Sequence, residues 1–209
     1  GRYTLCGKNA VLNPYRGEPE LEDAFEWLRN NVDQEKYRGV ILNNDCWVDV
    51  DTGNANKNYV PINKNEKKDY VNNILSRKKL PYENESMSTT EILNLIPKAY
   101  ENFEKIRQKI GWISDTMIIL KTTNIDDDLI IAISCNGKGF SKISNDDVKK
   151  YEQRMVMSLD IRLLKWLLYG PDKAHWSDAD LGSHLRYERV GSVYKRGLFY
   201  CWNYFCAET

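Results

Sequence analysis

Residues 116–143, TMIILKTTNIDDDLIIAISCNGKGFSKI, decide the fold class that this sequence predicts. Within them, residues 116–122 and 129–135 are two mostly apolar runs rich in β-branched side chains, separated by a polar turn sequence. Short apolar runs bounded by turn residues are typical of buried strands. Asn136-Gly137 favours a hairpin, because both central positions of that turn prefer a positive φ, and residues 140–143 continue the sheet. The stretch therefore predicts a set of antiparallel strands.

Helical patterns flank these strands. Ser88-Thr89-Thr90-Glu91 has the capping-box pattern, and a stripe of apolar residues follows it. Residues 155–157 indicate a further strand, and Ser158 is expected to cap a helix that ends at Gly170-Pro171. Ser192 is expected to cap the last helix. This order predicts an α+β fold, with an antiparallel or mixed sheet and helices packed on one face.

The N-terminal part has a different character. A helix is expected from Pro19, and residues 39–42 and 46–50 read as two short strands around a turn. Residues 52–68 are rich in Asn and Lys, which is typical of an exposed linker.

We therefore expect residues 1–67 to be the end of a preceding domain or an N-terminal extension with its linker. Residues 68–209 are expected to form an α+β C-terminal domain. The chain begins at Gly1 rather than Met, which fits a processed end, a tag remnant or a part of a longer protein.

Composition excludes several classes of protein. Thirty Lys and Arg balance thirty Asp and Glu, which argues against a nucleic-acid partner, because electrostatic nucleic-acid binders carry a basic excess. No apolar run approaches the roughly 18 residues of a membrane span, so we expect a soluble chain. Five cysteines without a secretory leader favour reduced thiols in the cytoplasm.

One segment, residues 175–189, concentrates chemical groups. Imidazoles can transfer protons near neutral pH, and guanidinium groups bind carboxylates or phosphates with two hydrogen bonds. The candidate catalytic residues are His175 and His184. The candidate binding residues are Trp176, Asp178, Asp180, Arg186, Arg189 and Arg196. A structural role is the alternative, with the carboxylates capping a turn, the arginines in ion pairs and Trp176 in the core.

No metal or other cofactor is expected in this chain. The two histidines lie nine residues apart, and neither a Cys-x-x-Cys nor a His-Glu-x-x-His motif occurs. The acidic run at residues 126–128 is interpreted as a solvated turn, because a calcium loop needs ligands at alternating positions. Cys201 lies on an apolar helix face and is expected in the core.

The segment also carries a resemblance to a known family. The residues concerned are His175-Trp176-Ser177-Asp178-Ala179-Asp180-Leu181-Gly182-Ser183-His184, Arg186, Arg189, Tyr194, Arg196-Gly197-Leu198 and Asn203-Tyr204-Phe205. This pattern resembles the C-terminal tail of metallo-β-lactamase-fold proteins of the group that includes the CMP-N-acetylneuraminate hydroxylase-like and ascorbate-phosphate lactonase-like proteins. The strand expected at residues 39–42 also looks like the last strands of that fold.

The family's His-x-His-x-Asp-His metal cradle is absent from the sequence. The resemblance therefore implies a non-catalytic C-terminal accessory region whose partner, an N-terminal catalytic portion or a separate chain, holds the metal. Such a region would support substrate binding or dimerisation. It should expose an apolar patch near residues 19–50, where the catalytic portion would pack.

Two alternatives stay open. The order of elements between residues 68 and 209 is similar to that of sterol-carrier-like domains, which implies a free-standing module with a closed cavity for an apolar ligand. The second alternative is that the chain is an enzyme in its own right. His175 or His184 would then be the acid/base, and Arg186, Arg189 and Arg196 would bind an anionic small-molecule substrate.

Overall fold

The computed structural model describes residues 21–33, 35–37, 39–125, 129–193 and 195–208. The chain divides into two compact units, with the boundary between Arg77 and Lys78, and each is treated by itself. The boundary expected from the sequence, after residue 67, falls inside helix α3 (Lys64–Asn73). Among the described residues, no helix combines the length and the apolar character that a bilayer crossing requires.

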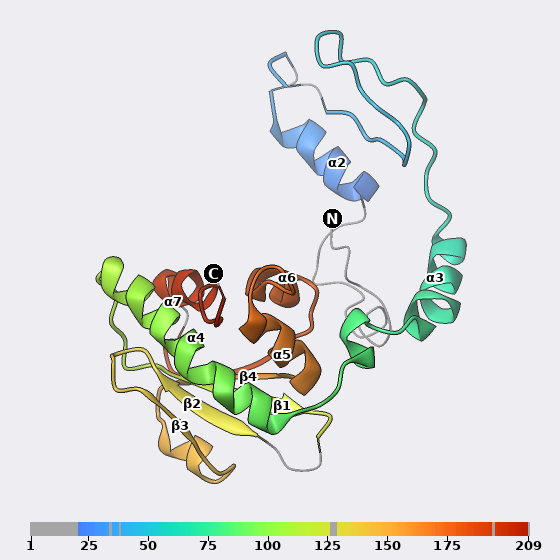
Figure 1. Ribbon diagram of the computed structural model, residues 1–209. Helices are drawn as coiled ribbons and strands as arrows, with labels where there is room; N and C mark the ends of the chain where they lie inside the picture. The colour runs from blue at the N-terminus through green and yellow to red at the C-terminus, as the bar shows by residue number, and fades with distance from the viewer. Residues whose placement is uncertain (1–20, 34, 38, 126–128, 194, 209) are drawn as a thin grey trace. The chain divides into compact units, whose positions relative to one another are not determined.

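The unit from Lys78 onward alternates helices and strands (Figure 1). Its elements, with η for a 3-10 helix, are η2 (Pro81–Asn84), α4 (Thr89–Lys109), β1 (Met117–Thr123), β2 (Ile130–Ser134), β3 (Phe140–Lys142), η3 (Asp147–Lys150), β4 (Arg154–Asp160), α5 (Ile161–Tyr169), α6 (Trp176–Leu181), β5 (Arg186–Val190) and α7 (Arg196–Trp202).

The five strands form one mixed sheet in the order β3-β2-β1-β4-β5. β1 and β4 are parallel, and the other neighbours are antiparallel. The four helices α4, α5, α6 and α7 lie on one face of the sheet and share a single apolar core with it (Figure 1). The predicted α+β fold with a mixed sheet is confirmed.

The opposite face of the sheet has a smaller apolar cluster. Ile119, Ile130, Ala132 and Val156 are buried there, because the connection from β3 to β4 packs against them with Ile143, Val148 and Tyr151. The two clusters alternate along β1 and β4, as the two-residue period of a strand requires.

Helix α4 begins where its capping box predicts. The Ser88 Oγ accepts a hydrogen bond of 3.2 Å from the Glu91 amide, which satisfies one of the free donors of the first turn. The Glu91 carboxylate accepts instead from the Tyr169 hydroxyl, at 2.5 Å. The box therefore also joins α4 to α5.

Three predicted boundaries in this unit are wrong. β4 runs on to Asp160, and Asp160 rather than Ser158 caps α5. Residues 186–190, for which no strand was predicted, form strand β5 against β4. The last helix begins after Lys195 and not after Ser192, because the chain bends at residues 191–192 as it leaves β5.

The hairpin after β2 is longer than the predicted two-residue turn. β2 ends at Ser134 and β3 begins at Phe140, and the glycines with positive φ are Gly137 and Gly139. Asn136 does not adopt a positive φ; its amide donates to the Asp115 carboxylate at 3.2 Å. This hydrogen bond holds Asn136 at the start of a loop that is longer than the predicted two-residue turn.

The unit that ends at Arg77 contains two described helices, α2 (Leu21–Asn31) and α3, followed by η1 (Leu75–Arg77). The expected start of the first helix at Pro19 lies outside the described residues. The two strands predicted within residues 39–50 do not form; one isolated bridge joins Val48 to Ala55. The Asn43 side chain instead hydrogen-bonds both the amide and the carbonyl of Val60.

Gly170 ends α5 in a conformation that only glycine tolerates, with φ 108° and ψ −168°. A Cβ there would lie 2.3 Å from the backbone oxygen of Glu208. Replacing Gly170 with alanine should therefore lower the free energy of unfolding by about 2–4 kcal/mol, measured by urea titration. Gly111→Ala is the matched control, because its φ is 64° and no atom lies within 4 Å. Equal losses in both variants would contradict the role of the Glu208 contact.

Candidate functional site

A pocket of about 200 Å³ lies where the parallel strands β1 and β4 end. It is lined by Tyr82, Thr123, Asn124, Ser158, Leu159, Asp160, Ser183, His184 and Arg186. Thr123 lies opposite Asp160 in the register, so the carboxyl ends of both strands meet at this edge. Edges formed by the carboxyl ends of parallel strands are common places for ligand sites. We call this feature the strand-end pocket.

Asp160 is a buried charged residue in the lining of the strand-end pocket. Its Oδ1 accepts from the amide and the Nε of Arg162, both at 2.9 Å, and its Oδ2 accepts from the Arg162 Nη2 at 2.7 Å. Asn124 also donates to Oδ2. Burial acts to raise the pKa of Asp160, but the hydrogen bonds from Arg162 and Asn124 outweigh it and lower that pKa. The carboxylate is therefore ionised and its charge is balanced by Arg162.

His184 is held in the pocket by a residue distant in sequence. Its Nδ1 lies 3.0 Å from the hydroxyl of Tyr82, and the two rings meet edge to face with centroids 5.6 Å apart. Tyr82 is itself buried and belongs to η2. A hydrogen bond at Nδ1 fixes the orientation of an imidazole ring.

Arg186 is the first residue of β5 and pairs with Ser158 of β4. Its side chain is exposed and lines the strand-end pocket. Across the described part of the chain, no carboxylate forms a salt bridge with it. Arg189 lies on the same strand but stacks on the ring of Tyr187, with the guanidinium carbon 4.6 Å from the ring centroid. The structure thus brings together His184 and Arg186 and leaves Arg189 outside the pocket.

The other predicted site residues lie elsewhere. His175 is exposed at the N-cap of α6, and Arg196 is exposed at the start of α7. Asp178 and Asp180 are half-buried on α6. Trp176 is buried, and its indole nitrogen donates to the Phe205 carbonyl at 2.8 Å, so it joins α6 to the residues after α7. None of these residues lines the strand-end pocket.

The sequence did not point to the remaining lining residues. Asn124 lies in the polar turn sequence between the first two predicted strands, and Asp160 lies two residues after Ser158, the expected cap of the next helix. The parallel pairing of β1 with β4 brings them together, and this pairing joins strands that are not consecutive in the chain. The acidic run at residues 126–128 lies outside the described residues.

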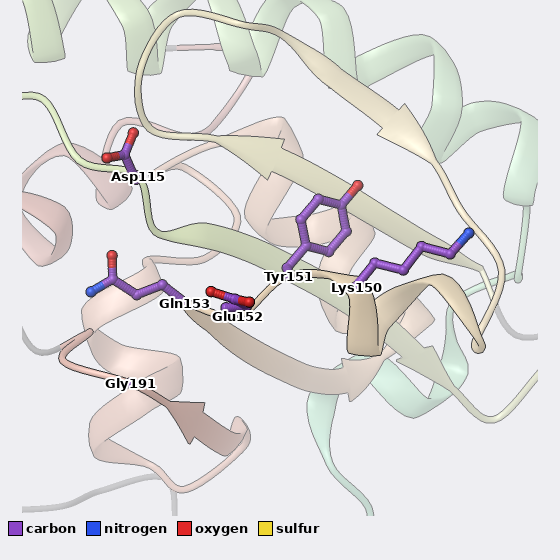
Figure 2. A pocket seen from close by; sticks show the side chains of 6 residues that line it. All are labelled: Asp115, Lys150, Tyr151, Glu152, Gln153 and Gly191. Atoms are coloured by element: carbon purple, nitrogen blue, oxygen red, sulfur yellow. The ribbon is translucent and has the colours of Figure 1, made fainter.

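A larger and more open surface depression, about 650 Å³, lies at the opposite ends of β1 and β4 (Figure 2). Its lining includes Asp115, Glu152 and Lys150. Figure 2 shows the Lys150 side chain extending away from Asp115. The Lys150 ammonium forms an ion pair with Asp147, and Asp115 accepts from Asn136. These charged groups do not converge on one point, so the depression offers no chemical centre.

Three of the described cysteines, Cys135, Cys201 and Cys206, are buried free thiols. Burial raises the pKa of Cys135 to about 12 and that of Cys201 to about 11, and it raises the pKa of Cys206. Thiols with such pKa values stay protonated at neutral pH and behave as small apolar side chains. The expectation that Cys201 lies in the core is confirmed.

The described residues contain no group of three or more His, Cys, Asp or Glu side chains arranged to hold a metal ion. The expectation that any catalytic metal is held by an N-terminal catalytic portion or a separate chain stays a prediction. Comparisons of the sequence and the fold with protein-family models, with curated proteins and with solved structures gave no significant match.

Proposed function

We propose that this chain is a non-catalytic accessory region of a metallo-β-lactamase-fold protein. In this proposal residues 78–209 are a domain with its own core, and the unit before them packs against the portion that holds the metal. The sequence pattern between His175 and Phe205 supports the family, and the contrast between the two units supports the accessory role.

The two units differ in whether they bury side chains. The unit from Lys78 onward has two buried apolar clusters, one on each face of its sheet. By contrast, none of the residues between 21 and 77 whose burial the structure describes is buried. A segment that buries none of its side chains gains little from the hydrophobic effect to offset its loss of conformational entropy. This observation carries the proposal, because such a segment needs another surface to fold against.

Large apolar side chains are available in this unit for such packing. Val50 is 91% exposed, Trp27 63% and Trp47 61%. Trp is enriched at the centres of protein interfaces, where it contributes much of the binding energy. These exposures agree with the expectation of apolar surface within residues 19–50. We propose that the metal-binding catalytic portion of the same assembly covers this apolar surface.

Photo-crosslinking in the source cells tests this proposal. A benzophenone amino acid replaces Trp27 or Trp47, and the same probe at Lys138, an exposed loop residue after β2, is the matched control. We expect both tryptophan positions to crosslink to a polypeptide that contains a His-x-His-x-Asp-His motif and holds metal, and the Lys138 position to give no such product.

Three other results would contradict the accessory role. Crosslinks from Trp27 to residues 78–209 of the same molecule would show that the chain covers its own apolar surface. Crosslinks to a second copy would show self-association, and capture of a protein without the metal motif would show a different partner.

A further inference from the structure

The strand-end pocket has a chemical composition that the accessory role does not require. Hydroxyl groups come from Thr123, Ser158 and Ser183, and an amide comes from Asn124. The positive side chain that lines the pocket is Arg186, while the negative one, Asp160, already forms an ion pair with Arg162. Uncharged donors around one guanidinium group are suited to an anion.

The backbone at the pocket is also unusual. Among the described residues, three that are not glycine have a positive φ, and two of them line this pocket: Asn124 at 63° and Ser183 at 59°. Non-glycine residues pay a conformational cost there, and such residues collect at ligand sites, where the surrounding structure holds them in place. The presence of two such residues in one pocket indicates that the positions of their side chains are important for a ligand site.

His184 follows Ser183 directly in the chain, and the hydrogen bond between its Nδ1 and the Tyr82 hydroxyl orients its ring. The pocket is therefore built by four separate segments: η2, the end of β1, the end of β4, and the turn from α6 into β5. Sites in which side chains are fixed by neighbouring segments bind ligands with less loss of conformational entropy.

From these observations we propose that the strand-end pocket binds a small oxyanion, the phosphate or carboxylate group of a small molecule. Arg186 is the charge partner, and the hydroxyl groups supply hydrogen bonds together with the second hydrogen of the Asn124 amide, whose first hydrogen bonds Asp160. The volume of about 200 Å³ is below the range of about 300–1,000 Å³ that is usual for whole drug-sized ligands. The pocket therefore holds the anionic group and leaves the rest of the molecule outside.

Nuclear magnetic resonance titrations of the complete chain with inorganic phosphate and, separately, with acetate test the proposal. We expect saturable shifts at the amides of Asn124, Ser183 and Arg186. Saturation by phosphate alone identifies a phosphate group, and saturation by acetate alone identifies a carboxylate. No saturation by either anion, or saturation of the same amides by Mg²⁺ instead, would overturn the proposal.

Matched arginine variants make the test specific. Arg186→Gln should weaken anion binding about tenfold or more, because it removes a charge-assisted hydrogen bond. Arg189→Gln removes the same charge from the same strand outside the pocket and should leave the affinity unchanged. Equal weakening in both variants would show nonspecific attraction to a basic strand and would overturn the proposal.

Ser183→Gly provides a variant that should fold, because glycine adopts a positive φ without strain. We expect unchanged or higher thermal stability together with weaker anion binding. Unchanged binding would remove Ser183 from the site and contradict the argument from backbone conformation. All these measurements use residues after Lys78, so their outcome is independent of the crosslinking test.

Discussion

Replacing Asp160 with alanine is expected to lower the free energy of unfolding by about 3–5 kcal/mol, because it breaks a buried ion pair by removing one partner. The Asp160 carboxylate is almost fully buried, accepts three hydrogen bonds from Arg162 and caps helix α5. Without it the Arg162 guanidinium stays largely buried and keeps only its bond to the Glu83 carbonyl. The change therefore removes the cap and leaves a poorly compensated charge.

Urea titration of the wild type and the variant measures this loss. Glu101→Ala is the matched control, because Glu101 also pairs with basic residues, Lys98 and Lys105, but in an exposed position. Exposed pairs contribute about 1 kcal/mol or less. If the two variants differ by less than about 1 kcal/mol, the buried pair does not carry the stability assigned to it.

The same residue sets an expected pH dependence, read from the Asp160→Asn variant. Burial opposes the effect, but the hydrogen bonds to Asp160 outweigh it and lower its pKa in the folded chain below the ordinary value of an aspartate. Its contribution to stability is therefore complete above that value and is lost as the pH falls through the folded pKa. The difference in unfolding free energy between wild type and Asp160→Asn should stay constant from neutral pH to about pH 5 and then shrink. A difference that grows on acidification would contradict the lowered pKa.

Strands could be predicted from the sequence where burial on both faces leaves a continuous apolar run. β2 (Ile130–Ser134) is buried at every position and was expected within one residue at each end. β5 (Arg186–Val190) was missed because it is an edge strand whose sequence, RYERV, is mostly charged and carries no apolar alternation. Its strand conformation comes from pairing with β4, which only the tertiary structure reveals.

The residue that caps helix α5 could not be identified from the sequence alone either. Ser158 and Asp160 are both good caps, so the sequence alone does not show which one ends the strand and starts the helix. The pairing of Thr123 with Asp160 decides it, because β4 continues to the end of β1. Sequence analysis found His184 and Arg186 from their residue types, but Tyr82, which orients His184, lies 102 residues away.

Phe205→Ala is expected to cost about 3–5 kcal/mol of unfolding free energy, as truncation of a fully buried phenylalanine does. Phe205 stacks on Trp202 with centroids 4.4 Å apart, and Phe103 and Trp176 meet its ring at 6.2 Å. The hydrogen bond from the Trp176 indole nitrogen to the Phe205 backbone carbonyl does not involve the Phe205 ring and survives the substitution, so the loss reports side-chain packing. Tyr200→Ala, on the exposed side of α7, is the control and should cost about 0.5 kcal/mol or less.

This variant also separates a packed aromatic core from the alternative of a cavity for an apolar ligand. These rings contact one another, so we expect no apolar ligand to enter the wild type. Removing the Phe205 ring leaves an apolar hole, and such holes stay dry and bind benzene. Benzene should therefore raise the melting temperature of Phe205→Ala and leave that of the wild type unchanged. A fatty acid or benzene that stabilises the wild type, or a Phe205→Ala variant that loses less than about 1 kcal/mol, would favour the sterol-carrier-like alternative, because an open cavity already present would tolerate the missing ring.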